Sequence, residues 1–205
     1  MKLTKLPLLA TLSLLTLTSV SVSWAQSTKR LIDEVNPFIG TSNFGTTNPG
    51  AVVPNGLMSI TPFNVSGSPE LNKFDKDKRW WSTPYTADNK FFSGFSHVNL
   101  SGVGCPELGS IIVSASAGDL DVDYTHYGSA MSEEKAHPGY YSVQLDKHKI
   151  KAEVTATQRT AVSAFTFERG GKSNILVNLG LGLTNESGAT VRFLNVLLYA
   201  SILYL

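Results

Sequence analysis

The sequence has very little cysteine and few charged residues. Cys105 is the single cysteine among 205 residues. One thiol cannot form an internal disulfide, so the fold has to be held together by its hydrophobic core. Charged residues make up 16% of the chain, and the formal net charge is +1. No run of lysine or arginine offers a basic surface, which excludes an electrostatic case for binding nucleic acid.

Residues 1–25 have the features of a secretory signal peptide. A basic start precedes an apolar stretch over 6–20, and Ser23 and Ala25 supply the small residues of a cleavage site. The apolar stretch is too short for a stable membrane span, although an uncleaved anchor stays an alternative. The segment holds two of the 17 basic residues and none of the 16 acidic ones, so the rest carries a formal charge of −1. We expect an exported protein, either periplasmic or extracellular.

The second half of the chain shows the patterns of short strands, with no segment of helical period. A strand at 57–61 is closed by Pro62. Further runs rich in β-branched and aromatic residues lie at 110–117, 140–145, 150–157, 161–167 and 173–179. In 150–157 small apolar residues alternate with polar ones, which places one face in a core. Gly170 and Gly171 are typical of a hairpin turn. The pattern predicts an all-β fold, a β-sandwich built from residues 26–195.

Residues 94–109, GFSHVNLSGVGCPELG, hold His97, Cys105 and four of the 17 glycines. Glycines allow a positive φ or the close approach of another group. A strand that enters such a loop would hold His97 and Cys105 at a sheet edge. On the residues alone, a glycine-rich connection with a satisfied histidine and a buried thiol is the simpler interpretation.

Two polar loops carry aromatic residues that have no local core. Phe44 lies in the loop 40–50, and Trp80 and Trp81 follow a run of mixed charges. Such rings either anchor the loop to the core or face a ligand, and sugar rings stack well on them.

Six motifs follow one another between roughly residues 35 and 185. They are VNPFIGT (35–41), NPGA (48–51), PNG (54–56), the stretch 94–109, PGYY (138–141) and EVTATQRT (153–160). In this order they resemble the N-terminal part of the glycoside hydrolase family 92 α-mannosidases. The resemblance implies the N-terminal β-sandwich domain of a two-domain glycosidase, whose C-terminal helical barrel is absent from this chain.

The resemblance also implies a function. Family 92 enzymes are calcium-dependent exo-α-mannosidases that invert the anomeric centre, acting on α-mannosides such as N-glycan mannose. Their acid, base and calcium ligands lie mainly in the helical barrel, so we assign no catalytic or metal-binding residue here and expect this chain to be inactive alone. Mannose-containing glycans and the missing barrel are the implied partners.

Loops of the family's sandwich domain line part of the mannose pocket. The matching positions are Phe44 and Gly45 in the first loop, Trp81 in the second, and His97 or Cys105 in the third. Many members carry Trp-Asp-Trp-Cys where this chain has Arg-Trp-Trp-Ser at 79–82, which suggests a different linkage preference. Two alternatives remain: a free-standing carbohydrate-binding β-sandwich without catalysis, and a structural or adhesin-like sandwich without a sugar site.

Three further segments need an interpretation. Asp119, Asp121 and Asp123 imitate a calcium loop, but Tyr124 stands where the loop needs glycine, so a strand edge with an acidic face is expected. Asn-x-Ser glycosylation signals begin at residues 64, 99 and 185. Residues 196–205, VLLYASILYL, are almost wholly apolar and too short to span a bilayer. We interpret this tail as a frameshifted end, the alternative being a buried terminal strand.

Overall fold

The computed structural model describes residues 30–43, 45–65, 82–104 and 108–183. The predicted signal peptide and apolar tail lie outside these residues, and so do Phe44, Trp81 and Cys105. The chain divides after Leu31 into two parts, and the fold below is that of the second part. Within the described ranges, no helix has the length and apolar character needed to cross a bilayer.

The described chain consists of short strands with very little helix. In chain order the elements are η1 (Leu31–Glu34), β1 (Ala51–Val52), β2 (Ser59–Phe63), β3 (Phe91–Phe92), β4 (Gly94–Asn99), β5 (Leu108–Ala117), α1 (Tyr124–Tyr127), β6 (Ser129–His137), β7 (Tyr140–Leu145), β8 (Ile150–Ala156), β9 (Ala161–Phe167) and β10 (Ser173–Asn178).

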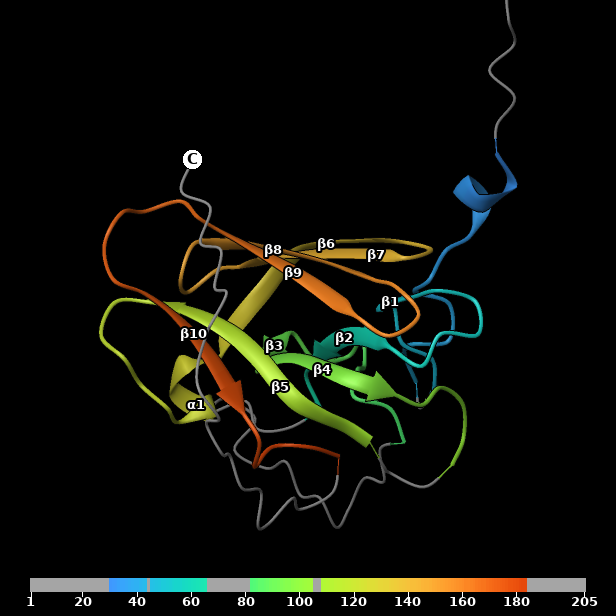
Figure 1. Cartoon of the computed structure of the whole chain (residues 1–205), viewed down its shortest axis with the longest axis horizontal. Coiled ribbons are helices and arrows are strands. Elements are labelled where there is room, and N and C mark those ends of the chain that lie inside the picture. The colour runs from blue at the N-terminus through green and yellow to red at the C-terminus, as the bar shows by residue number, and fades with distance from the viewer. Residues whose placement is uncertain (1–29, 44, 66–81, 105–107, 184–205) are drawn as a thin grey trace, which may run out of the picture. The chain divides into compact units, whose positions relative to one another are not determined.

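Two five-stranded sheets form a β-sandwich, which confirms the predicted fold class (Figure 1). The first sheet has the order β1-β2-β4-β5-β10, and the second has the order β3-β6-β7-β8-β9. All their pairs are antiparallel. From β6 to β9 the second sheet is a meander of consecutive strands, whereas the first sheet pairs β5 with the distant β10.

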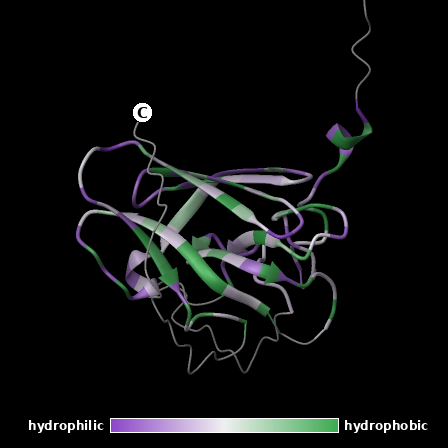
Figure 2. Cartoon of the chain, in the orientation of Figure 1, coloured by the Kyte–Doolittle hydropathy of each residue, from purple (hydrophilic) through white to green (hydrophobic). Residues whose placement is uncertain are grey.

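The hydrophobic core lies between the two sheets. Ile60 and Phe95 contribute to it from the first sheet, and Ala152, Val154 and Ala156 contribute from β8, as the alternating pattern predicts. Figure 2 shows the apolar segments on the strands, while the connecting loops are largely polar. Full burial of one large apolar side chain stabilises the fold by about 1.5–3 kcal/mol.

The hairpin predicted at Gly170 and Gly171 is wrong. β9 ends the second sheet and β10 ends the first, so residues 168–172 cross from one sheet to the other. Two contacts hold the end of this crossing, just before β10, against the residues that follow β5. Gly118 N–H donates to the Lys172 carbonyl at 2.9 Å, and the Lys172 side chain pairs with Asp119 at 2.7 Å. Glycines permit a sharp turn, but they do not decide which strand pairs next.

Two smaller expectations also differ from the structure. Strand β2 continues through Pro62, which lies opposite Phe95. Proline has no backbone N–H to donate. β1 pairs only with Ser59 and Ile60, so Pro62 has no β1 residue opposite it that would need this donor. Residues 119–123 form no strand edge, because Asp123 is the N-cap of α1 and accepts the Thr125 N–H at 2.9 Å.

Strand β6 contains a bulge that turns an acidic side chain into the core. Its register with β7 shifts between Ser132 and Lys135, so Glu133 and Glu134 together lie opposite Val143. Side chains alternate along a strand, so the extra residue reverses which ones point inward. Glu133 has a φ of 51° and is exposed, whereas the Glu134 side chain is 9% exposed.

The Glu134 carboxylate joins three donors. Its Oε2 accepts the hydroxyls of Tyr85 at 2.7 Å and Tyr141 at 2.8 Å, and its Oε1 lies 2.5 Å from Lys90 Nζ. Burial raises the pKa of Tyr85 and of Tyr141, and the neighbouring carboxylate adds to both shifts. Both tyrosines therefore stay protonated and serve as donors to the buried charge.

The variant Glu134→Ala should lower the free energy of unfolding by about 3 kcal/mol, because it leaves two buried hydroxyls without their acceptor. Glu133→Ala, one residue away but exposed, should change it by less than about 0.5 kcal/mol. Urea unfolding of both variants measures the difference. If Glu134→Ala lowered the free energy of unfolding no more than Glu133→Ala does, the buried network would contribute nothing to stability.

Candidate functional site

Gly102 connects the three segments that carry the predicted site residues. Its N–H donates to the carbonyl of Thr46 at 2.8 Å, and its own carbonyl accepts the Ser82 hydroxyl at 3.1 Å. Thr46 directly follows Gly45 in the first loop, and Ser82 follows the position of Trp81 in the second. Backbone groups of one residue thus hold all three loops together.

Glycine is required at Gly102 by its backbone conformation. Its φ is +99°, a region that residues with a Cβ rarely adopt. Among the described residues, apart from the neighbours of Gly102 in the chain, no atom lies within 4 Å of where a Cβ would be, so space is not the constraint there.

Gly45 is required for a different reason, which is close packing within the first loop. A Cβ there would lie 1.9 Å from the carbonyl oxygen of Gly40 and 2.9 Å from that of Ser42. The Gly45 N–H also donates to Ser42 at 2.8 Å. The tightness of the loop therefore explains the glycine, and its contact with a substrate stays a prediction.

Asn64 holds the second segment in place. It is fully buried, and its side-chain amide donates to the carbonyls of Thr86 at 2.7 Å and Asn89 at 2.6 Å, while its Oδ1 accepts the Thr86 N–H at 2.8 Å. The same segment reaches the first loop, where Ala87 N–H donates to the Thr41 carbonyl at 2.8 Å.

Asn99, the last residue of β4, holds the start of the third loop in place. Its side-chain amide donates to the carbonyls of Ser96 at 3.0 Å and Ser59 at 3.3 Å, and its Oδ1 accepts the Ser96 hydroxyl at 2.7 Å. Asn64 and Asn99 both begin glycosylation signals, and in both the amide that would carry a glycan is already hydrogen-bonded. Sequence reasoning noted these asparagines only as glycosylation signals and missed their role in the loops.

His97 lies on β4, which is flanked by β2 and β5, so the predicted position at a sheet edge is wrong. Its Nδ1 is 2.7 Å from the Ile111 carbonyl. A carbonyl can only accept, so Nδ1 carries the proton and Nε2 keeps a lone pair. Burial lowers the pKa of His97, although the bond to Ile111 acts in the opposite direction. The ring is therefore neutral at pH 7.

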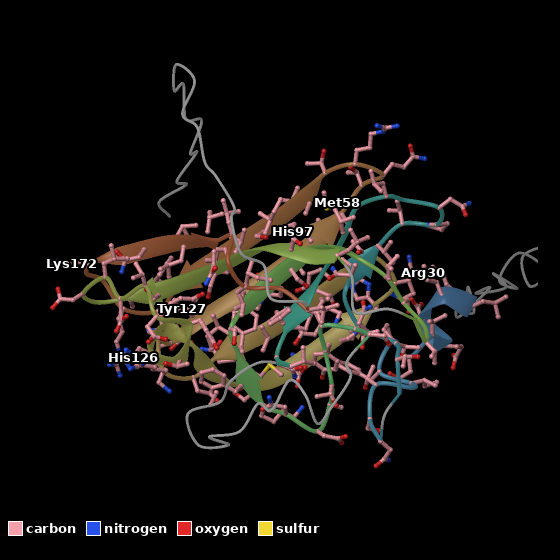
Figure 3. The ribbon with its side chains drawn as sticks, turned by 90° about the horizontal axis from the view of Figure 1, so that it is seen from below. Arg30, Met58, His97, His126, Tyr127 and Lys172 are labelled. Atoms are coloured by element: carbon pink, nitrogen blue, oxygen red, sulfur yellow. The ribbon has the colours of Figure 1, made fainter. Side chains whose placement is uncertain are left out.

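In the described residues, His97 makes no direct hydrogen bond to the three loops that meet at Gly102. Within the described ranges, no hydrogen bond joins it to Gly45 or Gly102, and it precedes the Asn99 root by two residues. Figure 3 shows His97 well apart from His126 and Lys172, which lie at the other end of the fold.

The described residues do not fit a metal site. They contain no group of three or more histidine, cysteine, aspartate or glutamate side chains that could hold an ion. Asp123, in the acidic segment 119–123, uses its carboxylate to cap α1.

Comparison with known proteins places these features in a family. The model described as the glycosyl hydrolase family 92 N-terminal domain matches residues 34–196. An "uncharacterized secreted glycosidase" of Arthroderma benhamiae is 28% identical over 185 residues, covering 83% of this chain and 22% of the relative.

Solved structures give the same family. A GH92 α-mannosidase from Bacteroides thetaiotaomicron, in complex with mannoimidazole, has 28% identity and a TM-score of 0.65, covering 74% of this chain and 20% of the other. A GH92 inverting mannosidase from the same species has 25% identity and a TM-score of 0.53, covering 73% and 20%. The chain thus spans about a fifth of the length of these relatives.

The variant Gly102→Ala should lower the free energy of unfolding by about 1–2 kcal/mol, the cost of holding a Cβ at positive φ. Gly104→Ala is the matched control, since Gly104 lies in the same loop, has equal space and has no positive φ. Thermal and urea unfolding measure both. A Gly104→Ala loss as large as that of Gly102→Ala would refute the conformational explanation.

Nitrogen-15 imidazole spectra should show His97 as the Nδ1–H tautomer at pH 7, with a titration midpoint below about 6.5. Because the unfolded histidine takes up a proton first, His97 should reduce stability as pH falls below about 6.5, by up to about 1.4 kcal/mol per pH unit. His97→Gln should remove that contribution. An Nε2–H tautomer would contradict the assigned hydrogen bond.

Proposed function

This chain belongs to glycosyl hydrolase family 92, of which it carries the N-terminal domain, and from this membership we propose that it lines part of the substrate pocket of an exported exo-α-mannosidase. The observation that carries the proposal is the meeting of the three loops at Gly102. The similar solved structures described as α-mannosidases support mannose as the sugar.

The proposed pocket wall has contacts of two kinds. Phe44 and Trp81 would stack on the apolar face of the sugar ring, with Gly45 giving the ring close access to the backbone. His97 would accept a sugar hydroxyl at Nε2, since its other nitrogen is occupied by Ile111. Cys105 is the remaining proposed contact, as a weak donor at the end of the third loop.

We propose that the hydrolytic chemistry belongs to a companion helical domain. Inversion needs one carboxylic acid to protonate the leaving oxygen and one carboxylate to activate water. Glu134 cannot serve in either role, because its oxygens are taken by Tyr85, Tyr141 and Lys90. We propose that the calcium requirement also belongs to the companion domain, since the described residues contain no group of three or more histidine, cysteine, aspartate or glutamate side chains that could hold an ion.

Export is supported by two observations. The start of the sequence has the pattern of a signal peptide, and a relative is described as a secreted glycosidase. We propose that the protein acts in the periplasm or outside the cell on mannose-containing glycans.

Titration of the nitrogen-15-labelled chain with methyl α-mannoside tests the proposal. We expect shifts of the Gly102 amide and the His97 imidazole, with a dissociation constant of about 1 mM or weaker, because one wall of a pocket leaves most of the sugar in water. His97→Ala should weaken binding about tenfold, the loss of roughly one hydrogen bond, and His126→Ala, at the other end of the fold, should not. No free mannose should appear.

Each outcome separates the hypotheses. Equal shifts with methyl α-galactoside, or none with either sugar, would contradict a mannose site and favour the structural sandwich. Micromolar affinity for mannose without hydrolysis would favour the free-standing carbohydrate-binding module. Release of mannose would show that an acid and a base are present in this chain.

A further inference from the structure

The two backbone outliers next to His97 are both β-branched residues. Within the described ranges, seven residues other than glycine have a positive φ, and the β-branched ones among them are Val98, with a φ of 56°, and Ile111, with a φ of 55°. Val98 follows His97 in the chain, and the carbonyl of Ile111 accepts the His97 ring N–H. A β-branched residue at positive φ is strained, and strain of this kind clusters at functional sites.

Ile111 is the extra residue of a bulge in β5. The register of β5 with β4 shifts between Phe95 and His97, so Ile111 and Ile112 together lie opposite Ser96. In one common type of bulge the first of the two residues takes a left-handed conformation, and that residue is normally glycine. In this chain an isoleucine takes that conformation, which it adopts only at a cost.

The bulge makes the Ile111 carbonyl available to a side chain. In the described strands, Ile111 has no partner residue in the register with β4 or with β10. Its carbonyl lies 2.7 Å from His97 Nδ1. Because a carbonyl can only accept a hydrogen bond, this contact places the ring proton on Nδ1 and leaves the lone pair on Nε2. The irregular backbone thus determines which nitrogen of the ring is the acceptor.

Buried contacts on β5 hold the strained residue in place. Ile112 is fully buried in a core cluster that also contains Phe63 and Val65. Its side chain packs closely on β4, since a Cβ at Gly94 would lie 2.3 Å from Ile112 Cγ2. Strained conformations persist only when the surrounding structure determines them. Ile111 therefore cannot relax without moving a core residue.

We propose that Ile111 is a positioning residue for His97, whose strained backbone holds the ring so that Nε2 is left to accept a sugar hydroxyl. The bulge is then part of the site, because it converts a backbone carbonyl into the group that fixes the ring. This inference rests on the proposed function for the role of Nε2, whereas the orientation of the ring can be measured without sugar.

Paired substitutions at Ile111 test whether its backbone is strained. Asparagine tolerates a left-handed φ and β-branched threonine does not, so Ile111→Asn should melt about 2–4 °C above Ile111→Thr. Ile175, a 55% exposed residue of β10 without a positive φ, is the control position. There the order should be reversed, because strands favour threonine over asparagine. The same order at both positions would overturn the proposal.

Nitrogen-15 imidazole spectra of the full chain at pH 7 test whether this backbone positions the ring. Ile111→Asn should keep the Nδ1–H tautomer of His97, because asparagine keeps the positive φ. Proline cannot take a positive φ, so Ile111→Pro should give a mixture of both tautomers and weaken binding of methyl α-mannoside by up to about tenfold. Ile175→Asn should change neither result. A folded Ile111→Pro that keeps the Nδ1–H form would overturn the proposal.

Circular dichroism shows whether each variant folds. If Ile111→Pro does not fold, Overhauser contacts in the wild type decide: the His97 Nδ1–H should lie close to the backbone protons of Ile111 and Ile112. Absence of these contacts would overturn the proposal. A wild type that shows them, with the crossed melting orders, but binds no mannoside would contradict the proposed function and uphold the role of Ile111 in orienting the ring.

Discussion

The buried carboxylate of Glu134 is the contact on which the candidate site depends. Tyr141 reaches it from the second sheet, while Tyr85 and Lys90 reach it from the segment that returns to β3. Asn64, just after β2, donates hydrogen bonds to two carbonyls of that same segment. The segment leading away from the Trp81 position is therefore fixed on both sides, although it has no regular secondary structure over 82–90. A buried charge is costly, and here three donors offset that cost.

The loops of the site are held by hydrogen bonds more than by apolar contacts. Asn64, Asn99 and Ser82 satisfy backbone groups that a strand or helix would otherwise satisfy. Such bonds are directional, so they fix the positions of loops that carry few core residues. Loops that are fixed in this way would suit the proposed pocket wall, because their geometry would be set before a ligand arrives.

The sequence predicts the meander well and the loop arrangement poorly. Strands 140–145 and 161–167 are predicted with the observed bounds, since apolar and aromatic residues mark them from end to end. Strand β6 is missed because Glu133 and Glu134 at its bulge break the alternation. The crossing after β9 is missed because the glycines specify a turn and not a partner. The meeting at Gly102 joins a backbone carbonyl and one serine hydroxyl that lie far apart in the chain, and neither forms a recognisable sequence pattern. The family resemblance is confirmed by the family model, which matches residues 34–196.

The hydrogen-bonded side-chain amides of Asn64 and Asn99 have a consequence for producing the protein. Glycosylation at Asn-x-Ser attaches a bulky sugar to the side-chain amide and needs a surface site. At Asn64 and Asn99 that amide is held inside the fold, so modification can occur only on a chain that has not yet folded. In a eukaryotic secretory host, where the sugar is added to the emerging chain, we expect glycosylated material that cannot close its loops, detectable as a heavier and less stable fraction. A bacterial periplasm adds no such glycan, so expression there should leave both amides free to make these hydrogen bonds.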